Sequence, residues 1–330
     1  MTNPVDELVR RTAERLAARR KGAVVVGAAH GDLTATYGAD PGTLFEIGSI
    51  TKTFTSLALA RLVVRGELTL GRPLRDLLPA AVPRRDGHDI ELVHLACHTS
   101  GLPRLPKGLM PRALWQTADP YAGCTEAVLL DGLARTRLRS TPGRRFRYSN
   151  LGAGLLGLAL ARHAGVGYDE LIQAEICRPL GLTDTRVTLT GEHASRLAPG
   201  HSAFGRPRPG WRLAALAGAG GLHSTVPDLL RLARATFGEA PEELVKAIAL
   251  SRGTGHRLGR ASTAHPGWLS MTRAGDREGP RLLFHNGGTG GYRSLLAVIP
   301  ERRAAVAVLS ADARAVDRPG LGLLAQMVSS

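Results

Sequence analysis

Apolar extended runs at both ends of the chain constrain its fold more than any other feature. Two of them lie near the N-terminus, where His30-Gly31-Asp32 separates them as a hairpin-like turn, and three close the chain. Short turns between such runs favour antiparallel pairing. The five runs are residues 22–29, 33–37, 281–286, 292–299 and 304–309. We therefore expect an α+β fold in which one five-stranded antiparallel sheet is built from both ends of the chain.

The middle of the chain has a different pattern. Residues 73–227 are mostly helical segments and loops, and prolines mark several breaks in them. With 330 residues and 43% hydrophobic content, the chain can form one large domain or two lobes that share a cleft. We expect a mostly helical lobe at residues 73–227, inserted into a discontinuous α/β sheet lobe made of residues 1–72 and 228–330.

Ser49-Ile50-Thr51-Lys52 places a hydroxyl and an amine on one face of a predicted helix. Apolar residues recur at helical spacing after Ser49, and Gly48 ends the extended run before it, so Ser49 begins this helix. Three residues advance a helix by about 4.5 Å, and side chains at this spacing lie roughly 5–6 Å apart. Lys52 can therefore reach the Ser49 hydroxyl, which suits nucleophilic catalysis. Taken alone, Ser49 is better explained as a helix cap, so further motifs are needed.

Lysine usage supports the first interpretation. The chain has 43 basic residues, but only four are lysines: Lys21, Lys52, Lys107 and Lys246. Arginine cannot act as a proton acceptor, whereas a buried lysine can have its pKa lowered enough to do so. The lysine at position 52 is thus consistent with a role in proton transfer.

The net charge of +15 raises nucleic-acid binding as an alternative function. The arginines are spread along the chain, aromatic residues make up only 4%, and no nucleic-acid-binding motif is present. We expect instead a solvated basic surface, or a field that steers anionic substrates. His94 and His98 lack a third ligand and the H-E-x-x-H glutamate, so neither a metal nor a cofactor is expected.

The N-terminal segment does not contain the uninterrupted apolar region of about 7 to 15 residues that a signal peptide needs. No stretch approaches the roughly 18 apolar residues of a membrane span. The three cysteines show neither a disulfide framework nor zinc-ligand spacing. These observations predict a cytoplasmic protein without a membrane partner, and they do not indicate an oligomeric state.

Two further motifs follow Ser49-x-x-Lys52 in order along the chain. Tyr148-Ser149-Asn150 comes after Thr141-Pro142-Gly143, and His285-Asn286-Gly287-Gly288 stands at the end of an apolar strand. In this order the motifs resemble the class C β-lactamase and penicillin-binding family of serine hydrolases, which includes D-Ala-D-Ala carboxypeptidases and esterases. Framework segments similar to that family are residues 45–48, 97–103, 178–182 and 219–225.

The resemblance implies a β-lactamase/transpeptidase-like fold: a five-stranded antiparallel sheet flanked by helices, a helical lobe, and an active site in the cleft between them. It also implies that Ser49 attacks an ester or amide carbonyl. Lys52 and Tyr148 would form one proton network that activates the hydroxyl and protonates the leaving group. Of the two, the resemblance favours Tyr148 as the base.

The other site residues are implied in the same way. Asn150 would hold the polar part of the substrate and Lys52, and the N–H groups of Ser49 and Gly288 would form an oxyanion hole. Gly287 and Gly288 would let the substrate lie close to the strand. His285 replaces the lysine of the lactamases' third motif, and a neutral histidine recognises a carboxylate weakly. That departure argues against efficient β-lactamase activity and leaves the substrate class open.

Three functions remain open at this point. The first is a serine acyl-enzyme hydrolase acting on an ester or amide of a small molecule. The second is a transacylase of a biosynthetic pathway, in which an amine or alcohol takes the acyl group in place of water. The third is a non-catalytic sensor that accepts an acyl group and keeps it. The sequence does not distinguish them, because they share the first half-reaction.

Overall fold

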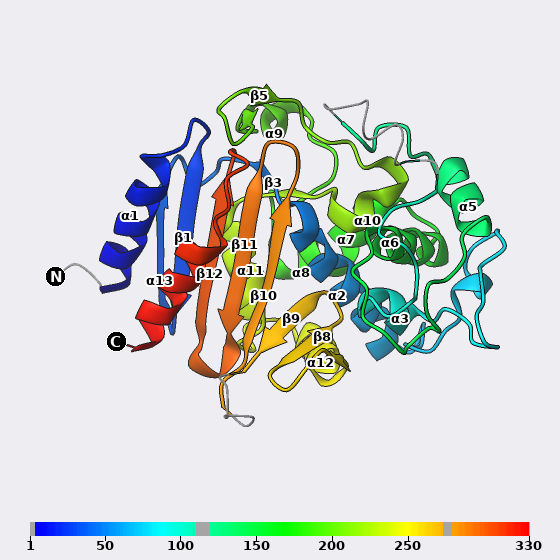
Figure 1. The fold of residues 1–330 in the computed structure, drawn as a ribbon. Helices are drawn as coiled ribbons and strands as arrows, with labels where there is room; N and C mark the ends of the chain where they lie inside the picture. The colour runs from blue at the N-terminus through cyan, green and yellow to red at the C-terminus, as the bar shows by residue number, and fades with distance from the viewer. Residues whose placement is uncertain (1–3, 108, 110–118, 273–278, 330) are drawn as a thin grey trace.

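The computed structural model describes residues 4–107, 109, 119–272 and 279–329. Its largest sheet has eight strands in the order β2-β1-β12-β11-β10-β9-β8-β7, and every neighbouring pair is antiparallel. The five strands expected from the sequence lie side by side in it (Figure 1): β1 (Val24–His30), β2 (Leu33–Gly38), β10 (Leu282–Gly288), β11 (Arg293–Ile299) and β12 (Ala304–Ser310). The prediction that both chain ends build one antiparallel sheet is confirmed.

The predicted number of strands is wrong, because the sheet continues beyond β10. Three short strands extend it: β7 (His256–Arg257), β8 (Ser262–His265) and β9 (Trp268–Met271). Strand β7 is a His-Arg pair, and β8 and β9 are four residues long and mix polar with apolar residues, so none of the three shows an apolar run. Two small sheets pair β3 (Phe45–Glu46) with β6 (His223–Ser224), and β4 (Gly200–His201) with β5 (Pro207–Arg208).

Helices cover both faces of the large sheet (Figure 1). On one face lie α1 (Pro4–Ala17) and α13 (Asp317–Ser329), and on the other lie α2 (Thr51–Val64), α11 (Val226–Ala235) and α12 (Glu242–Gly253). Strand β1 shows why two layers of helix are needed. Val24 and Val26 belong to the core under α1 and α13, whereas Val25 belongs to the core on the opposite face. A strand that is apolar on both sides must be covered on both sides.

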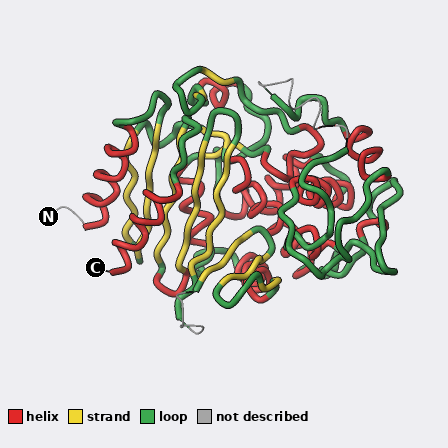
Figure 2. Tube along the Cα trace, viewed as in Figure 1, coloured by secondary structure: helices red, strands yellow, loops and turns green. Residues whose placement is uncertain are grey.

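A mostly helical region lies beside the sheet (Figure 2). The α-helices there are α3 (Leu92–Ala96), α5 (Glu126–Ala134), α6 (Asn150–Ala164), α7 (Tyr168–Ile172) and α10 (Ala217–Gly220). Two short helices lie elsewhere: α8 (Arg178–Leu180) packs against α11, and α9 (Gly191–Ser195) lies near β5 (Figure 1). Gly157 of α6 meets Gly218 of α10 so closely that a Cβ on either would lie 2.9 Å from the other's Cα. The glycine-rich start of α6 therefore serves close helix packing. The division of the chain at residues 72 and 227 stays a prediction.

Shorter helical turns connect these elements. The 3₁₀ turns are η1 (Gly48–Ile50), η2 (Leu74–Asp76), η4 (Ala214–Leu216) and η5 (Pro300–Arg302), and η3 (Gln173–Cys177) is a π-helix. None of the described helices is long and apolar enough to cross a membrane.

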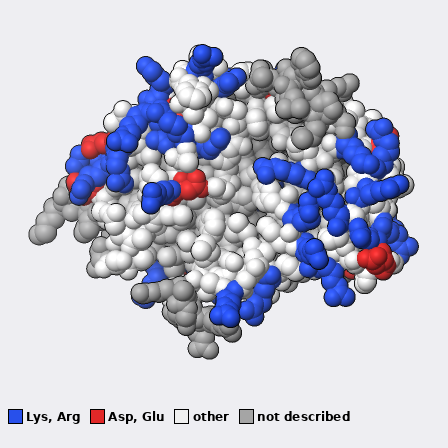
Figure 3. Space-filling view, viewed as in Figure 1, with Lys and Arg blue, Asp and Glu red and all other residues white. Residues whose placement is uncertain are grey.

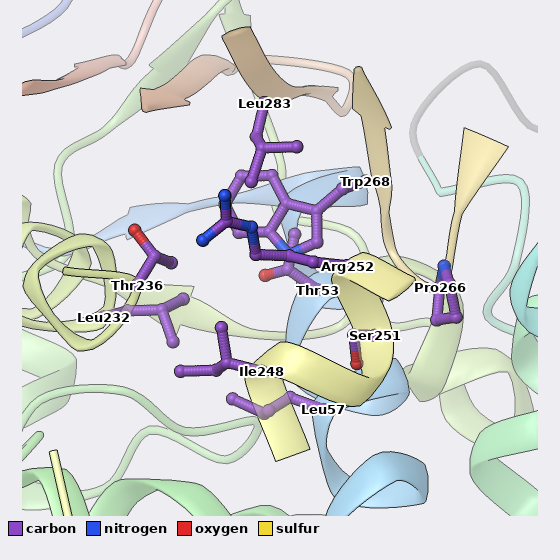
Figure 4. Close-up of a pocket in the computed structure, with 10 residues that line it drawn as sticks. All are labelled: Thr53, Leu57, Leu232, Thr236, Ile248, Ser251, Arg252, Pro266, Trp268 and Leu283. Carbon is purple, nitrogen blue, oxygen red and sulfur yellow. The ribbon is translucent and has the colours of Figure 1, made fainter. Parts of the chain in front are cut away.

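Helix α2 is buried between the sheet and the helical region. Residues 51–60 and Leu62 are all buried, so the helix is surrounded by protein on every side. A small pocket at its flank is lined by side chains from α2, α11, α12, β9 and β10, among others (Figure 4). The pocket has room for about 20 Å³, which is enough for a single water molecule. The packing on this flank therefore holds α2 firmly in place.

Candidate active site

The turn before α2 brings Ser49 and Lys52 together. Gly48 has a φ of 50°, in the left-handed region that glycine adopts without strain, and the 3₁₀ turn η1 then leads into α2. Lys52 Nζ donates hydrogen bonds to Ser49 Oγ at 2.9 Å and to the carbonyl oxygen of Ala219 in α10. The Lys52 side chain thus reaches the serine hydroxyl as its spacing predicts.

Lys52 lies in an environment that disfavours its charged form. The residue is only 2% exposed, and burial lowers its pKa well below the ordinary value because the ammonium group loses its hydration. The positive charge of Arg104 lowers the pKa further. A lysine in this state can be neutral and accept a proton, which an arginine in its place could not do.

Tyr148 provides a second partner for Ser49. Its hydroxyl donates a hydrogen bond to Ser49 Oγ at 2.8 Å. The residue stands just before α6, whose first turn is capped by Ser149, because Ser149 Oγ accepts a hydrogen bond from Gly152 N at 2.9 Å. Burial raises the pKa of Tyr148 to about 12, although the hydrogen bond to Ser49 opposes the shift. The phenol therefore stays protonated at neutral pH and acts as a donor to Ser49.

The end of β10 lies against the serine turn. Strand β9 pairs only with residues 282–284 of β10, so the part that contains His285, Gly287 and Gly288 has no strand on that side among the described residues. A Cβ on Gly287 would lie 2.1 Å from the carbonyl oxygen of Ile47 and 3.0 Å from Ser49 N. A Cβ on Gly48 would lie 2.7 Å from Gly288 N. Turn and strand therefore meet backbone to backbone, which only glycine permits here.

His285 is buried on the same strand. Its Nδ1 lies 2.7 Å from the carbonyl oxygen of Asn286, to which it can donate, and its ring centroid lies 6.4 Å from that of Tyr148. Burial and the nearby Lys52 lower the pKa of His285 to about 3. The imidazole is neutral at physiological pH, so it supplies no fixed positive charge to the site.

Asn150 opens helix α6 next to Tyr148. Its Nδ2 donates a hydrogen bond of 3.5 Å to the hydroxyl of Tyr121, and its Oδ1 is buried without a hydrogen-bond partner among the described residues. The expected hydrogen bond between Asn150 and Lys52 is absent from the described part of the chain. The unsatisfied Oδ1 is therefore available to an N–H group of a ligand or of Lys52.

A buried carboxyl group lies three residues before the serine. Glu46 is 4% exposed, and its Oε1 accepts a hydrogen bond from the main-chain N–H of Trp211 at 2.8 Å. Burial raises the pKa of Glu46 to about 7. The indole of Trp211 contacts the ring of Tyr121 edge-on, with centroids 5.2 Å apart. The hydroxyl of Tyr121 accepts the hydrogen bond from Asn150, so contacts through Trp211 and Tyr121 link Glu46 to Asn150.

Some residues at the site have no individual role in the sequence motifs. His98 packs against the ring of Tyr148 with centroids 4.4 Å apart, and its Nδ1 accepts a hydrogen bond from Ser149 N at 3.2 Å. Ala219 contributes only its carbonyl oxygen, so its side chain gives no signal. Arg104 follows the framework segment that contains His98, but nothing in the sequence places it near Tyr148. The segments that contain His98 and Ala219 were recognisable from the sequence as family framework. Their contacts with the site residues were not.

The geometry defines a class of site. Ser49 receives hydrogen bonds from an amine and a phenol, lies in the 3₁₀ turn that leads into the buried helix α2, and stands beside Gly287 and Gly288 at the edge of β10 that β9 leaves unpaired. This is the arrangement that nucleophilic catalysis by a serine requires.

Comparisons with known proteins give the family. The family model described as beta-lactamase matches residues 5–326. The D-alanyl-D-alanine-carboxypeptidase/endopeptidase AmpH of Escherichia coli K12 is 31% identical over 277 residues, which cover 79% of this chain and 69% of that protein. The esterase EstB of Burkholderia gladioli is 28% identical over 270 residues, with 68% and 65% covered. The chain belongs to the beta-lactamase family.

A solved structure agrees with this assignment. The beta-lactamase/D-alanine carboxypeptidase from Yersinia pestis, solved with citrate, superposes with a TM-score of 0.83 at 27% identity and covers 98% of each chain. The family resemblance and the β-lactamase/transpeptidase-like fold predicted from the motifs are therefore confirmed.

Proposed function

We propose that this protein is a serine acyl-enzyme hydrolase that acts on an ester or amide of a small molecule. The observation that carries the proposal is the pair of hydrogen bonds that Ser49 Oγ receives from Lys52 Nζ and Tyr148 OH. Membership of the beta-lactamase family supports it, because the relatives named above include a carboxypeptidase and an esterase.

The pKa directions support a division of roles between the two partners. Ser49 Oγ forms a bond to the substrate carbonyl carbon while its proton passes to the neutral amine of Lys52. The phenol of Tyr148, whose pKa burial raises, delivers a proton to the departing alcohol or amine and then takes up the proton that Lys52 received from Ser49. Water attacks the acyl-enzyme while its proton passes to the neutral amine of Lys52, which returns a proton to Ser49 Oγ as the acid leaves. This division makes Lys52 the acceptor, in contrast to the preference for Tyr148 drawn from the family motifs.

Backbone groups stabilise the charge on the substrate oxygen in this proposal. The N–H groups of Ser49 and Gly288 donate to the oxyanion, and each such donor is worth about 2.7–4 kcal/mol of barrier. Asn150 Oδ1, which lacks a partner among the described residues, accepts an N–H of the substrate. The neutral state of His285 favours esters and amides over β-lactams that are recognised by a carboxylate at this strand. A cytoplasmic location stays a prediction.

Intact-mass spectrometry with a short-chain p-nitrophenyl ester tests the proposal. Wild type and Ser49→Ala are compared with and without a panel of amines, while released phenol and the fate of the acyl group are followed. We expect a transient acyl adduct on wild type only, resolving to free acid whether or not an amine is present. The matched control is Ser56→Ala, which changes a buried serine of helix α2 outside the site.

The other outcomes separate the alternative functions. An adduct that persists until an amine takes the acyl group would make the protein a transacylase. An adduct that neither water nor an amine removes would identify an acyl-accepting sensor. If no activated ester gives a Ser49-dependent adduct, the acyl-enzyme proposal is wrong.

A further inference from the structure

The motif residues of the site supply no permanent positive charge at neutral pH. Burial lowers the pKa of both Lys52 and His285, which disfavours a positive charge on either side chain. Arg104 is different because a guanidinium group stays charged in proteins. Its side chain is exposed, and its guanidinium carbon lies 5.7 Å from the ring centroid of Tyr148, within the range of a cation–π contact. A permanent cation therefore stands beside the tyrosine that contacts Ser49.

The main chain fixes Arg104 in this position. The carbonyl oxygen of Arg104 accepts a hydrogen bond from Leu151 N at 3.1 Å, and that of Pro103 accepts one from Ser149 Oγ at 2.7 Å. The segment 103–104 is thus tied to the start of α6, which follows Tyr148 directly. No ion pair occupies the guanidinium of Arg104 within the described ranges of the chain. The charge is held over the site and is free to bind an anion.

Further cations continue from Arg104 across the same surface. Figure 3 shows Lys and Arg side chains gathered over the part of the molecule where α3 and α6 lie, with few acidic side chains among them. A shallow cleft of about 330 Å³ beside Pro103 is lined by Lys107, Arg137 and Arg139. Other exposed arginines nearby in the chain are Arg144, Arg145 and Arg147. Such a surface raises the local concentration of anions near the site entrance.

We propose that Arg104 makes the site selective for anionic substrates: it binds a carboxylate of the ester or amide whose carbonyl group lies at Ser49. This inference rests on the proposed acyl-enzyme function and adds a class of substrate to it, namely anionic acyl compounds. The contact is a charge-assisted hydrogen bond on the exposed side of Tyr148, and such bonds are stronger than neutral ones. Arg104 acts on substrate binding, while Lys52 and Tyr148 carry out the proton transfers.

A matched pair of esters tests Arg104. The mono-p-nitrophenyl ester of glutarate has a free carboxylate, and its methyl ester has the same chain without the charge. We expect wild type to prefer the anionic ester by about tenfold or more in kcat/KM, in line with a hydrogen bond to a charged group. Arg104→Ala should remove this preference mainly through KM, so that kcat/KM falls further for the anionic ester than for the methyl ester. The loss of its effect on the pKa of Lys52 acts on both esters alike and cancels in their ratio. Arg104→Lys should keep part of it, because lysine retains the charge but not the planar fork.

Arg145→Ala is the control variant, since it removes one exposed cation of the same region that has no described contact with the site. It should leave the preference within about twofold of wild type. A wild type without preference, or an Arg104→Ala variant that loses activity equally on both esters, would overturn the proposal. In the latter case Arg104 would act through the pKa of Lys52 or through folding.

A binding measurement separates this inference from the proposed function. In the Ser49→Ala background, calorimetry compares the two esters with and without Arg104→Ala, so that no turnover is needed. Tighter binding of the anionic ester, lost with Arg104, supports the inference even if wild type forms no acyl adduct. Equal binding of both esters contradicts it, whatever the enzyme assay shows.

Discussion

A single methyl group at Gly287 tests whether the contact between strand and serine turn creates the oxyanion site. The Cβ of Gly287→Ala would lie 2.1 Å from the carbonyl oxygen of Ile47 and 3.0 Å from Ser49 N. A third close atom, Ser294 Oγ at 2.3 Å, belongs to a side chain, but these two are main-chain atoms. Strand β10 and the turn must therefore separate by about 1 Å, and a displacement of that size can cost about 10²-fold in rate. Loss of one oxyanion donor costs about 10²–10³-fold in kcat. We expect kcat to fall by at least about 10²-fold.

Gly288→Ala is the matched control. Its Cβ would meet Arg293 Nη1 at 2.7 Å, the end of a long side chain that can move away once its hydrogen bonds to the carbonyl oxygens of Thr289 and Tyr292 rearrange. Neither glycine has a positive φ, so both variants report on contact and not on backbone strain. We expect Gly288→Ala to stay within about threefold of wild type.

The assay is kcat for p-nitrophenyl ester hydrolysis, together with a urea unfolding curve for each variant. Overpacking should lower the stability of Gly287→Ala by about 1–3 kcal/mol without unfolding it. A folded Gly287→Ala variant that keeps more than half of the wild-type kcat would refute the reasoning. An equal loss of kcat in Gly288→Ala would also refute the reasoning, because the Arg293 side chain should move to accommodate that methyl group.

Three further changes test individual side chains. Tyr148→Phe removes one of the two donors to Ser49 Oγ and should lower kcat by about 10²-fold or more; a rate within threefold of wild type would contradict this. Glu46→Gln keeps an acceptor for the N–H of Trp211 but cannot ionise. Because burial raises the pKa of Glu46 from 4.5 to about 7, wild type loses stability as the pH rises through this range. The free energy of unfolding of the variant should rise by up to about 3 kcal/mol relative to wild type between about pH 5 and pH 8. Urea midpoints of the two proteins that change with pH in the same way would contradict this. The pKa of His285 is lowered from 6.5 to about 3, so its contribution to stability is lost as the pH falls below about 6.5. His285→Asn should therefore be less sensitive to acid than wild type, which urea midpoints at about pH 7 and pH 4.5 measure.

The sequence predicts those parts of the fold whose signal is local. Strand β12, for example, has seven buried residues in a row, and a short apolar run of this kind between turns indicates a strand buried on both faces. Strands β7 to β9 are too short and too polar for such a signal, and they form because β10 offers them an edge. The sheet was therefore predicted with five strands although it has eight.

The candidate site divides in a similar way. Ser49 and Lys52 are close in sequence, so helical geometry alone brings them together. Tyr148 was placed beside them only by resemblance to a family, because no local rule connects residues so far apart. The carbonyl oxygen of Ala219 and the guanidinium of Arg104 had no signal of either kind. Main-chain acceptors and long-range cations depend on the tertiary fold, which residue patterns do not report.

The order in which the chain is synthesised gives the β1–β12 pairing a further meaning. Val24 pairs with Ser310, and the carbonyl oxygen of Ile47 accepts a hydrogen bond from Ser294 Oγ at 2.8 Å. The serine is thus made early, but the strands that hold its turn leave the ribosome late. Until then β1 presents an unpaired apolar edge, which is prone to wrong pairing. A nascent chain that stops before β12 should therefore need protection from aggregation and should carry a serine without a finished site.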